Sequence, residues 1–157
     1  MKHRPIQVLI LTVILFCLAR PAFARTDYTG EWKLDRSRSD LGPLETLAVL
    51  VRKVTHDDPR LIIEIEMDRG TDKQSGELRL LTQGEEASGT IAGEETAGSA
   101  LWLGDQLLMT TTRELDGLAM RIDELWTLSV DGLTLRVDAV VTTPKGREEL
   151  LVIFVKQ

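Results

Sequence analysis

Acid–base residues stand side by side at His56, Asp57 and Asp58, and His56 is the only histidine beyond residue 24. A histidine next to a carboxylate can act as a general base when a serine nucleophile lies within reach. No G-x-S-x-G motif, which would present such a serine, occurs in the sequence. Because Pro59 follows, we interpret residues 56–59 as a turn with an exposed histidine, and we expect no enzymatic activity.

Metal ligands are scarce as well. Structural zinc sites need nitrogen and sulfur ligands, whereas the whole chain has one cysteine and two histidines. Acidic pairs at residues 85–86, 94–95 and 148–149 could bind calcium weakly, but they lack the spacing of a calcium-binding loop. We interpret them as solvated surface. The sequence therefore predicts neither a metal nor another cofactor.

Glu124 interrupts an apolar pattern, because it shares its alternating phase with Ile122 and Trp126. A carboxylate buried among such residues needs a partner or becomes neutral. Three interpretations remain open. Glu124 forms an ion pair with an arginine of a neighbouring strand, for which Arg113 and Arg136 are candidates. Alternatively it contacts a ligand in a hollow barrel, or a β-bulge turns it outward.

Residues 118–141 carry the clearest structural pattern, two alternating runs around Asp131-Gly132. Asp-Gly between such runs predicts a β-hairpin with a type I′ turn, because both central residues of that turn need positive φ. The apolar phase of this hairpin consists of Met120, Ile122, Trp126, Leu128 and Val130 before the turn and Leu133, Leu135, Val137, Ala139 and Val141 after it.

Shorter alternating segments fill the rest of the chain, separated by turns of Gly, Asp and Pro. In one of them Leu47, Val49 and Val51 share a face. Residues 35–44 are interpreted as a loop with a short helical turn. Residues 83–99, rich in Gly and Glu, are either a mobile rim or a pair of solvated hairpin loops. The further predicted strands are residues 28–34, 46–55, 61–67, 77–81, 90–92, 100–103, 106–114 and 148–155.

These segments predict an all-β fold, an antiparallel up-and-down β-barrel of about 8–10 strands. We expect the last strand to pair with the first, because closure removes the exposed edges of the sheet. The interior of a barrel of this size is filled by side chains or holds one small ligand, and both remain open.

Residues 1–24 have the features of a secretory signal peptide: basic residues 2–4, an apolar run at residues 6–19, and the small residues Ala22 and Ala24 before the cleavage site. The apolar run, about 14 residues, is shorter than the roughly 20 of a spanning helix, so no stable membrane anchor is expected after cleavage. We expect a secreted or periplasmic protein with one domain at residues 25–157.

The net charge of the chain argues against two classes of binding partner. The formal net charge is −6, and it falls to −9 without residues 1–24, which hold three basic residues and no acidic one. Nucleic acids and anionic membrane surfaces attract basic proteins. Neither is an expected partner.

Gly30-Glu31-Trp32 resembles the G-x-W motif of lipocalins and their barrel relatives, including avidins. Residues 29–35, 126–135 and 154–157 are together similar to a group of small secreted bacterial lipocalin-like (calycin-type) proteins of unassigned function. The resemblance implies that Trp32 plugs the closed end of a barrel. It leaves Lys156 in the place of the arginine that covers this tryptophan in true lipocalins.

We therefore hypothesise that the chain binds a small apolar or amphipathic molecule inside a lipocalin/avidin-like barrel. The alternative is a protein-binding module, such as a secreted protease inhibitor, which would use residues 25–28 or 35–44. The candidate ligand-binding residues are Trp102, Met109, Met120, Ile122, Glu124 and Trp126.

Overall fold

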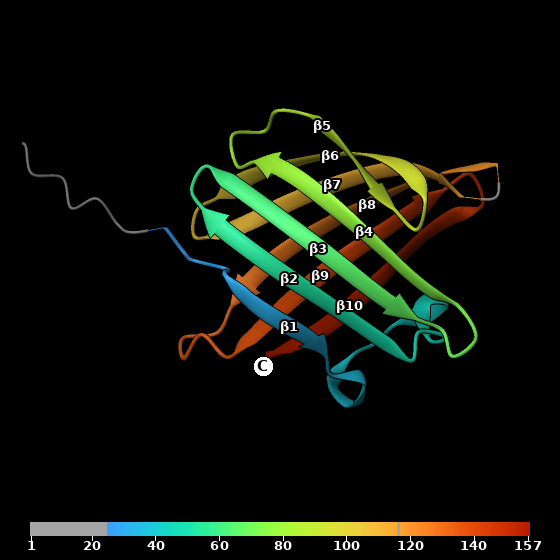
Figure 1. Ribbon diagram of the computed structural model, residues 1–157, viewed down its shortest axis with the longest axis horizontal. Coiled ribbons are helices and arrows are strands. Elements are labelled where there is room, and N and C mark those ends of the chain that lie inside the picture. The colour runs from blue at the N-terminus through green and yellow to red at the C-terminus, as the bar shows by residue number, and fades with distance from the viewer. Residues whose placement is uncertain (1–24, 116) are drawn as a thin grey trace, which may run out of the picture.

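A computed structural model describes residues 25–115 and 117–157, and this part of the chain forms ten strands (Figure 1). The expected signal peptide, residues 1–24, lies outside the described residues. The strands are β1 (Gly30–Leu34), β2 (Val49–Asp57), β3 (Arg60–Asp68), β4 (Lys73–Leu81), β5 (Ala87–Ile91), β6 (Glu94–Leu103), β7 (Gln106–Leu115), β8 (Leu118–Leu128), β9 (Thr134–Thr143) and β10 (Gly146–Lys156).

The sheet closes on itself, because every strand pairs with its neighbours in sequence and β1 pairs with β10. Trp32 lies opposite Lys156, and Leu34 lies opposite Phe154, at the closing pair. All pairs are antiparallel. The predicted all-β, antiparallel, up-and-down barrel is confirmed, and its ten strands are the upper limit of the expected number.

Two single-turn 3-10 helices, η1 (Arg36–Arg38) and η2 (Gly42–Leu44), connect β1 to β2. Asp35 begins η1, because its carboxylate accepts a hydrogen bond from the backbone N–H two residues on. Asp40 then bridges to Leu151 of β10, so this connection follows the barrel wall. Within residues 25–115 and 117–157, no helix is long and apolar enough to cross a membrane.

Residues 83–99 are more ordered than their composition suggested. They include β5, which spans Ala87–Ile91 instead of the expected residues 90–92, and the first half of β6. Gly89 lies inside β5 because the neighbouring strand approaches closely: a Cβ there would lie 2.4 Å from the Glu77 carbonyl oxygen. The expected strand at residues 90–92 was therefore too short: Gly89 and Gly98 lie inside strands, whereas Gly84 and Gly93 lie in the connections between them.

The β8–β9 hairpin forms where it was predicted, but with a five-residue loop, residues 129–133. The Gly132 N–H donates to the Ser129 carbonyl over 2.9 Å, and Gly132 has a φ of +71° while Asp131 has no positive φ. The expected type I′ turn is therefore wrong. Val130 and Leu133, expected to continue the apolar phase, are exposed in this loop.

In β2 the face that carries Val49 and Val51, which the sequence pattern grouped with Leu47, is not the face that points into the barrel. Val49 and Val51 lie on the outer side of the barrel, whereas Arg52 and His56 are buried on the inner side. The strand carries apolar residues on both phases, so alternation alone did not choose between them. This register brings a cation and a histidine into the barrel.

Candidate functional site

Aromatic side chains fill one end of the barrel. This closed end is the one at which β2 turns into β3, and that turn lies on the left in Figure 1. The Tyr28 ring packs edge-on against Trp126, with centroids 5.7 Å apart, and stacks on Trp102 at 6.0 Å. Its hydroxyl donates to the Trp126 carbonyl oxygen over 3.0 Å. Burial, with the nearby Asp105 carboxylate adding to it, raises the pKa of Tyr28 to about 12. Core side chains therefore fill the barrel at this end.

His56 is buried at the closed end, so the prediction of an exposed turn histidine was wrong. β2 continues through Asp57, which keeps His56 on the inner face. Its Nδ1 accepts the backbone N–H of Tyr28 over 3.3 Å, and its Nε2 lies 3.7 Å from Oδ1 of Asp58. Asp58 also accepts the indole N–H of Trp102 over 2.9 Å. His56 therefore holds the N-terminal segment against the barrel.

Trp32 lies inside the barrel beside the closing pair of strands and has no exposed surface. Its indole N–H donates to the Tyr28 carbonyl oxygen over 2.9 Å. The Nζ of Lys156 lies 5.3 Å from the Trp32 ring centroid, within range of a cation–π contact. The geometry is that of a plug covered by a cation, as the sequence resemblance implied.

Glu124 faces inward and is paired with Arg52 across the barrel. The Arg52 Nη1 and Nη2 atoms donate to the two carboxylate oxygens over 2.8 and 2.7 Å, a bidentate geometry. The Trp126 indole N–H donates to Oε2 over 2.8 Å. Of the three interpretations of Glu124 the ion pair is present, but the expected partners were wrong: Arg136 binds Asp138 on the outer face, and Arg113 lies elsewhere.

The buried carboxyl of Glu124 stays ionised because its partners outweigh its desolvation. Burial alone raises the pKa of a carboxyl group. The positive charge of Arg52, the hydrogen bonds from Arg52 and the bond from Trp126 hold the pKa of Glu124 below its ordinary value. The pair is therefore a fixed, electrically balanced part of the interior.

A small inner cavity of about 90 Å³ lies next to this ion pair, on the side away from the closed end. Side chains of every strand except β1 and β6 line it up to the level of the pair, and the next inward residues toward the closed end do not. Arg52 and Glu124 therefore form its floor. The apolar lining residues are Leu44, Leu47, Leu50, Ile65, Met67, Leu78, Ile91, Met109, Ile122, Ala139, Val141, Leu150 and Val152.

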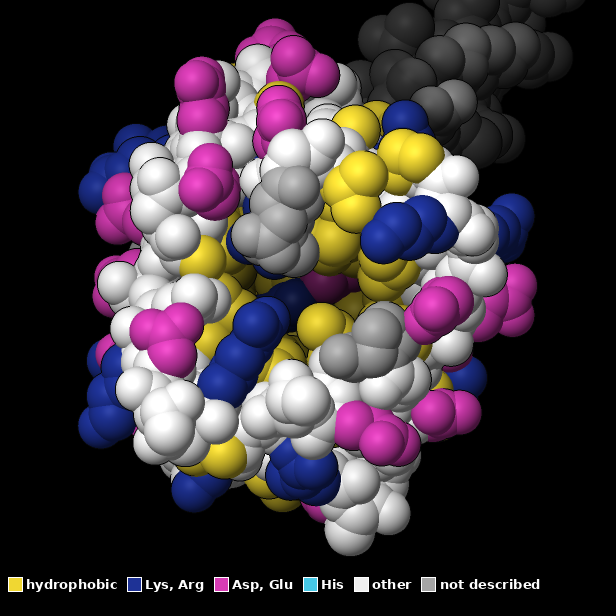
Figure 2. Space-filling model, turned by 90° about the vertical axis from the view of Figure 1, so that its right-hand side faces the viewer, with side chains coloured by type: hydrophobic (Ala, Val, Ile, Leu, Met, Phe, Trp, Pro, Cys, Tyr) yellow, Lys and Arg dark blue, Asp and Glu magenta, His cyan; other side chains and the backbone are white. Residues whose placement is uncertain are grey.

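A wider chamber of about 500 Å³, the mouth, opens above the inner cavity. The two share Leu44, Arg69, Arg113, Ile122 and Val141 in their walls. Figure 2 looks onto this end and shows a hollow with apolar walls and basic side chains beside it. The barrel is thus solid at one end and open at the other.

The sequence-predicted site residues divide between the two ends. Met109 and Glu124 line the inner cavity, Met120 lines the mouth, and Ile122 lines both. Trp126 lies below the floor, where it supports Glu124. Trp102 packs at the closed end and lines neither cavity. Ligand contact remains a prediction for all six residues.

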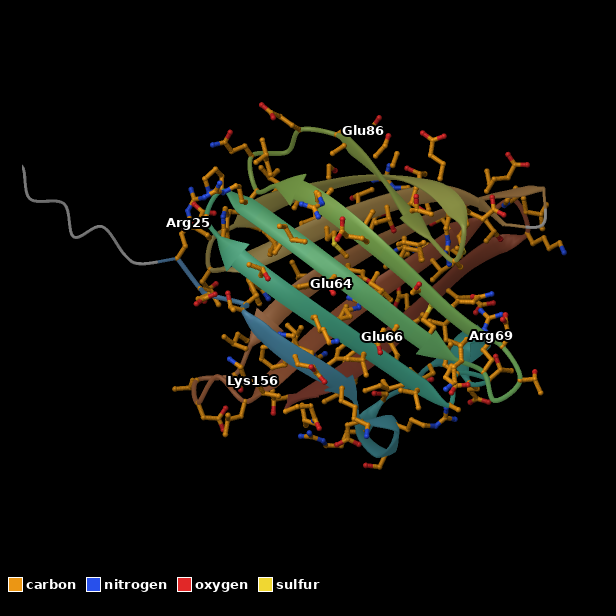
Figure 3. All side chains as sticks on the ribbon, viewed as in Figure 1. Arg25, Glu64, Glu66, Arg69, Glu86 and Lys156 are labelled. Carbon is orange, nitrogen blue, oxygen red and sulfur yellow. The ribbon has the colours of Figure 1, made fainter. Side chains whose placement is uncertain are left out.

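The sequence did not predict that three arginines line the cavities: Arg52, Arg69 and Arg113. Of these, Arg113 was considered only as a partner of Glu124. Arg69 follows β3 directly and lies at the open end, whereas Arg25 lies at the opposite end of the molecule (Figure 3). The signal for Arg52 was its place on one phase with Leu50 and Val54. Within residues 25–115 and 117–157, no group of three His, Cys, Asp or Glu side chains could hold a metal ion.

No family model matches the sequence, and no curated protein matches it significantly. Solved barrel structures do match the fold. Zebrafish ileal bile acid-binding protein complexed with cholic acid has a TM-score of 0.56 at 14% identity, covering 84% of this chain and 100% of that one. A Schistosoma mansoni fatty acid binding protein in complex with arachidonic acid has a TM-score of 0.51 at 15% identity, covering 83% and 96%.

Human cRBP IV gives a TM-score of 0.50 at 12% identity, covering 84% of this chain and 99% of that one. At this level of identity the similarity concerns the fold. The chain therefore shares with these proteins the fold of a closed ten-strand antiparallel barrel, and the match covers nearly the whole length of each of them.

Proposed function

We propose that this chain is a secreted or periplasmic binding protein that holds one small apolar or amphipathic molecule in the open half of its barrel. The observation that carries the proposal is the apolar inner cavity that continues into the mouth. Two structures with the same fold contain such molecules, cholic acid and arachidonic acid. Concave, mostly apolar sites with a few polar groups are the common form of small-molecule sites.

The two volumes assign different parts of the ligand to the two chambers. The mouth, about 500 Å³, lies within the range of small-molecule pockets, roughly 300–1,000 Å³, whereas the inner cavity of about 90 Å³ does not. The body of the ligand therefore occupies the mouth, and one apolar end enters the inner cavity. Met67 and Met109 line that cavity, and their flexible side chains can adapt to its occupant.

Binding is proposed instead of catalysis because the acid–base groups at the cavity are engaged. Glu124 is the only carboxylate among the described residues that line the inner cavity, and it is held by Arg52 and Trp126. A second carboxylate, Glu148, lines the mouth, and the described residues of that lining include no histidine, cysteine or serine. These features support a binding site with no covalent step.

Secretion is proposed from the pattern of residues 1–24. Expression in a Gram-negative host, followed by mass spectrometry of the exported protein, tests it. We expect a mature chain that begins at Arg25. Recovery of only the full-length chain from the cytoplasm would reject the proposed location and leave the binding site untouched.

A matched pair of variants on β9 tests binding inside the barrel. Val141 lines both chambers, whereas its neighbour Val140 lies on the outer face. Val141→Phe adds volume to the passage, and Val140→Phe makes the same change outside. We expect titration with Nile red and with dodecanoate to show binding to the wild type and to Val140→Phe, and at least tenfold weaker binding to Val141→Phe.

Folding of both variants is checked by circular dichroism and melting temperature, since overpacking destabilises by roughly 1–3 kcal/mol. The proposal fails when neither probe binds the wild type. It also fails when a folded Val141→Phe protein binds as tightly as the wild type, because the molecule would then lie outside the barrel.

A further inference from the structure

We propose that the ligand of this barrel carries one anionic headgroup, a carboxylate or a phosphate, and that the Arg113 guanidinium binds it at the mouth with Arg69 beside it. The inference rests on the proposed binding function and names the chemical class of its ligand. Arg52 and Arg113 both point into the barrel, but they differ in their partners: Arg52 is paired with Glu124, whereas two nitrogens of Arg113 have no hydrogen-bond partner among the described residues.

Arg113 points inward from β7 and lines both chambers. Its Nε and Nη1 atoms are buried and have no hydrogen-bond partner among residues 25–115 and 117–157. The side chain as a whole is half-buried. Buried polar atoms without a partner are unfavourable, so such atoms are normally paired or bind a ligand. Arg52 shows the ordinary solution, since Glu124 neutralises its charge through two hydrogen bonds.

The surroundings of Arg113 increase its need for an anion. Burial lowers the pKa of Arg113, and the positive charge of Arg69 lowers it further, with only Glu94 acting in the opposite sense. Like charges are thus held together at the edge of an apolar chamber. An anion placed between them would remove this repulsion.

The mouth as a whole has the opposite charge to the protein. Its lining contains four basic side chains, Arg69, Arg113, Lys145 and Arg147, and one acidic one, Glu148. The full chain has a net charge of −6. A basic mouth on an acidic protein favours an anion at this one place. The fork of a guanidinium fits the oxygens of carboxylate and phosphate groups, which defines the headgroup.

Ligands that share one tail and differ in headgroup test the inference. The series is dodecanoate, dodecyl phosphate, dodecanol and dodecylammonium, titrated into the purified protein below their micellar concentrations and followed by calorimetry. We expect the two anions to bind at least tenfold more tightly than the alcohol, and the cation to bind most weakly. The ratio of the affinities for dodecanoate and dodecyl phosphate distinguishes a carboxylate site from a phosphate site.

Variants of two arginines locate the contact. Arg113→Gln removes the inner cation, and Arg121→Gln makes the same change on the outer face of β8, where Arg121 binds Asp123. We expect Arg113→Gln to weaken the anions by roughly tenfold to a hundredfold and to spare dodecanol, which also shows that the variant is folded. Arg113→Lys keeps the charge and should retain part of the preference. Arg121→Gln should bind every ligand as the wild type does.

The outcomes separate this inference from the proposed function. Equal affinity for dodecanoate and dodecanol overturns the anionic headgroup and leaves the apolar site standing. An anion preference that survives in Arg113→Gln overturns the assignment to Arg113. Failure of all four ligands to bind the wild type rejects the binding function itself, and the inference falls with it.

Discussion

The pairing of Glu124 with Arg52 is the strongest polar interaction inside the barrel, and its loss has a defined cost. Glu124→Gln leaves the Arg52 cation buried without a counter-charge. We expect a loss of about 3–5 kcal/mol in the free energy of unfolding, measured by urea denaturation. Asp123→Asn is the matched control, because Asp123 directly precedes Glu124 on β8 and its pair with Arg121 lies on the outer face.

The control should lose less than about 1 kcal/mol, as is usual for exposed ion pairs. Replacing both inner partners, in Arg52→Met with Glu124→Leu, should restore most of the stability because no charge is then left buried. Equal losses in Glu124→Gln and Asp123→Asn would mean that the inner pair contributes no more than a surface pair.

The lowered pKa of Glu124 makes this stabilisation depend on pH. A carboxyl group with a lower pKa in the folded state stabilises above its unfolded pKa, here 4.5, and the contribution is lost as pH falls through the folded value. Melting temperatures of the wild type should therefore drop below pH 4.5 more steeply than those of the Arg52→Met, Glu124→Leu double variant. Parallel curves would contradict the ion pair.

Tyr28 offers a direct spectroscopic check of the closed end, because it is the only tyrosine in the chain. We expect its absorbance at about 295 nm to titrate near pH 12 in the folded protein and near pH 10 in urea. The raised pKa also means that stability is lost as pH rises from about 10 to about 12. A midpoint near 10 with circular dichroism unchanged would show that the phenol is solvated.

At the level of single residues, the sequence singled out Glu124 and included its ion pair among three open interpretations, but it did not identify the partner. Its shared phase with Ile122 and Trp126 suggested an inward position, where a carboxylate must be paired or become neutral. The partner could not be predicted because Arg52 lies 72 residues away on a strand with apolar residues on both faces. His56 was missed for the same reason, since one extra pair of residues in β2 turned it inward.

Among the strands, the contact of β4 with β5 is the shortest, with two pairs of residues, Gly76 with Ile91 and Glu77 with Thr90. Every other pair of neighbouring strands has three or more. Few backbone hydrogen bonds hold this seam, so it depends on the close approach that Gly76 and Gly89 allow. Such a region opens before the rest of the sheet.

Gly89→Ala should destabilise the seam, because the new Cβ would meet the backbone of Glu77 at 2.4 Å. We expect a loss of about 1–3 kcal/mol and faster amide exchange in β5. Gly98→Ala is the control: its Cβ would meet the end of the Leu80 side chain at 3.1 Å, which can move, and the Thr110 carbonyl oxygen at an ordinary contact distance of 3.7 Å. Equal losses in the two variants would show that intrinsic glycine effects, not the seam, set the stability.

The same glycines explain why this part of the barrel was the hardest to predict. A segment with Gly at positions 84, 89, 93 and 98 has the composition of a loop. Two of these glycines do lie at turns with positive φ, Gly84 and Gly93, and the other two lie in strands. Only the approach of the neighbouring backbone distinguishes the two kinds, and that is a property of the folded barrel.

For the whole molecule, the closure of the barrel was the most predictable feature. Alternation and turn spacing indicated a sheet without helices, and the G-x-W motif with the terminal strand indicated where it closes. In the structure the Gln157 N–H donates to the Glu31 carbonyl oxygen over 3.0 Å, so the C-terminal residue lies beside β1. What could not be predicted is that one half of the interior is filled.

The end of β10 lies beside β1, which makes the barrel a candidate for circular permutation. Arg25 contacts the side chains of Asp58 and Trp102, so a Gly/Ser linker from Gln157 to Arg25 must reach that point. With new ends in residues 129–133, the permutant keeps every strand pair. We expect the far-ultraviolet spectrum and dodecanoate binding of the parent protein, with some loss of melting temperature. A permutant that folds with new ends inside β9 equally well would contradict the continuous sheet.

The position of the Arg52–Glu124 pair midway down the barrel has a consequence for ligand size. In a homologous series, each methylene that enters an apolar space adds about 0.8 kcal/mol. That gain ends once the terminal methyl group reaches the charged floor, because the next carbon would have to displace two fixed ions. Longer tails would then extend into water, so under the proposed function the depth of this ion pair would set the preferred number of carbon atoms.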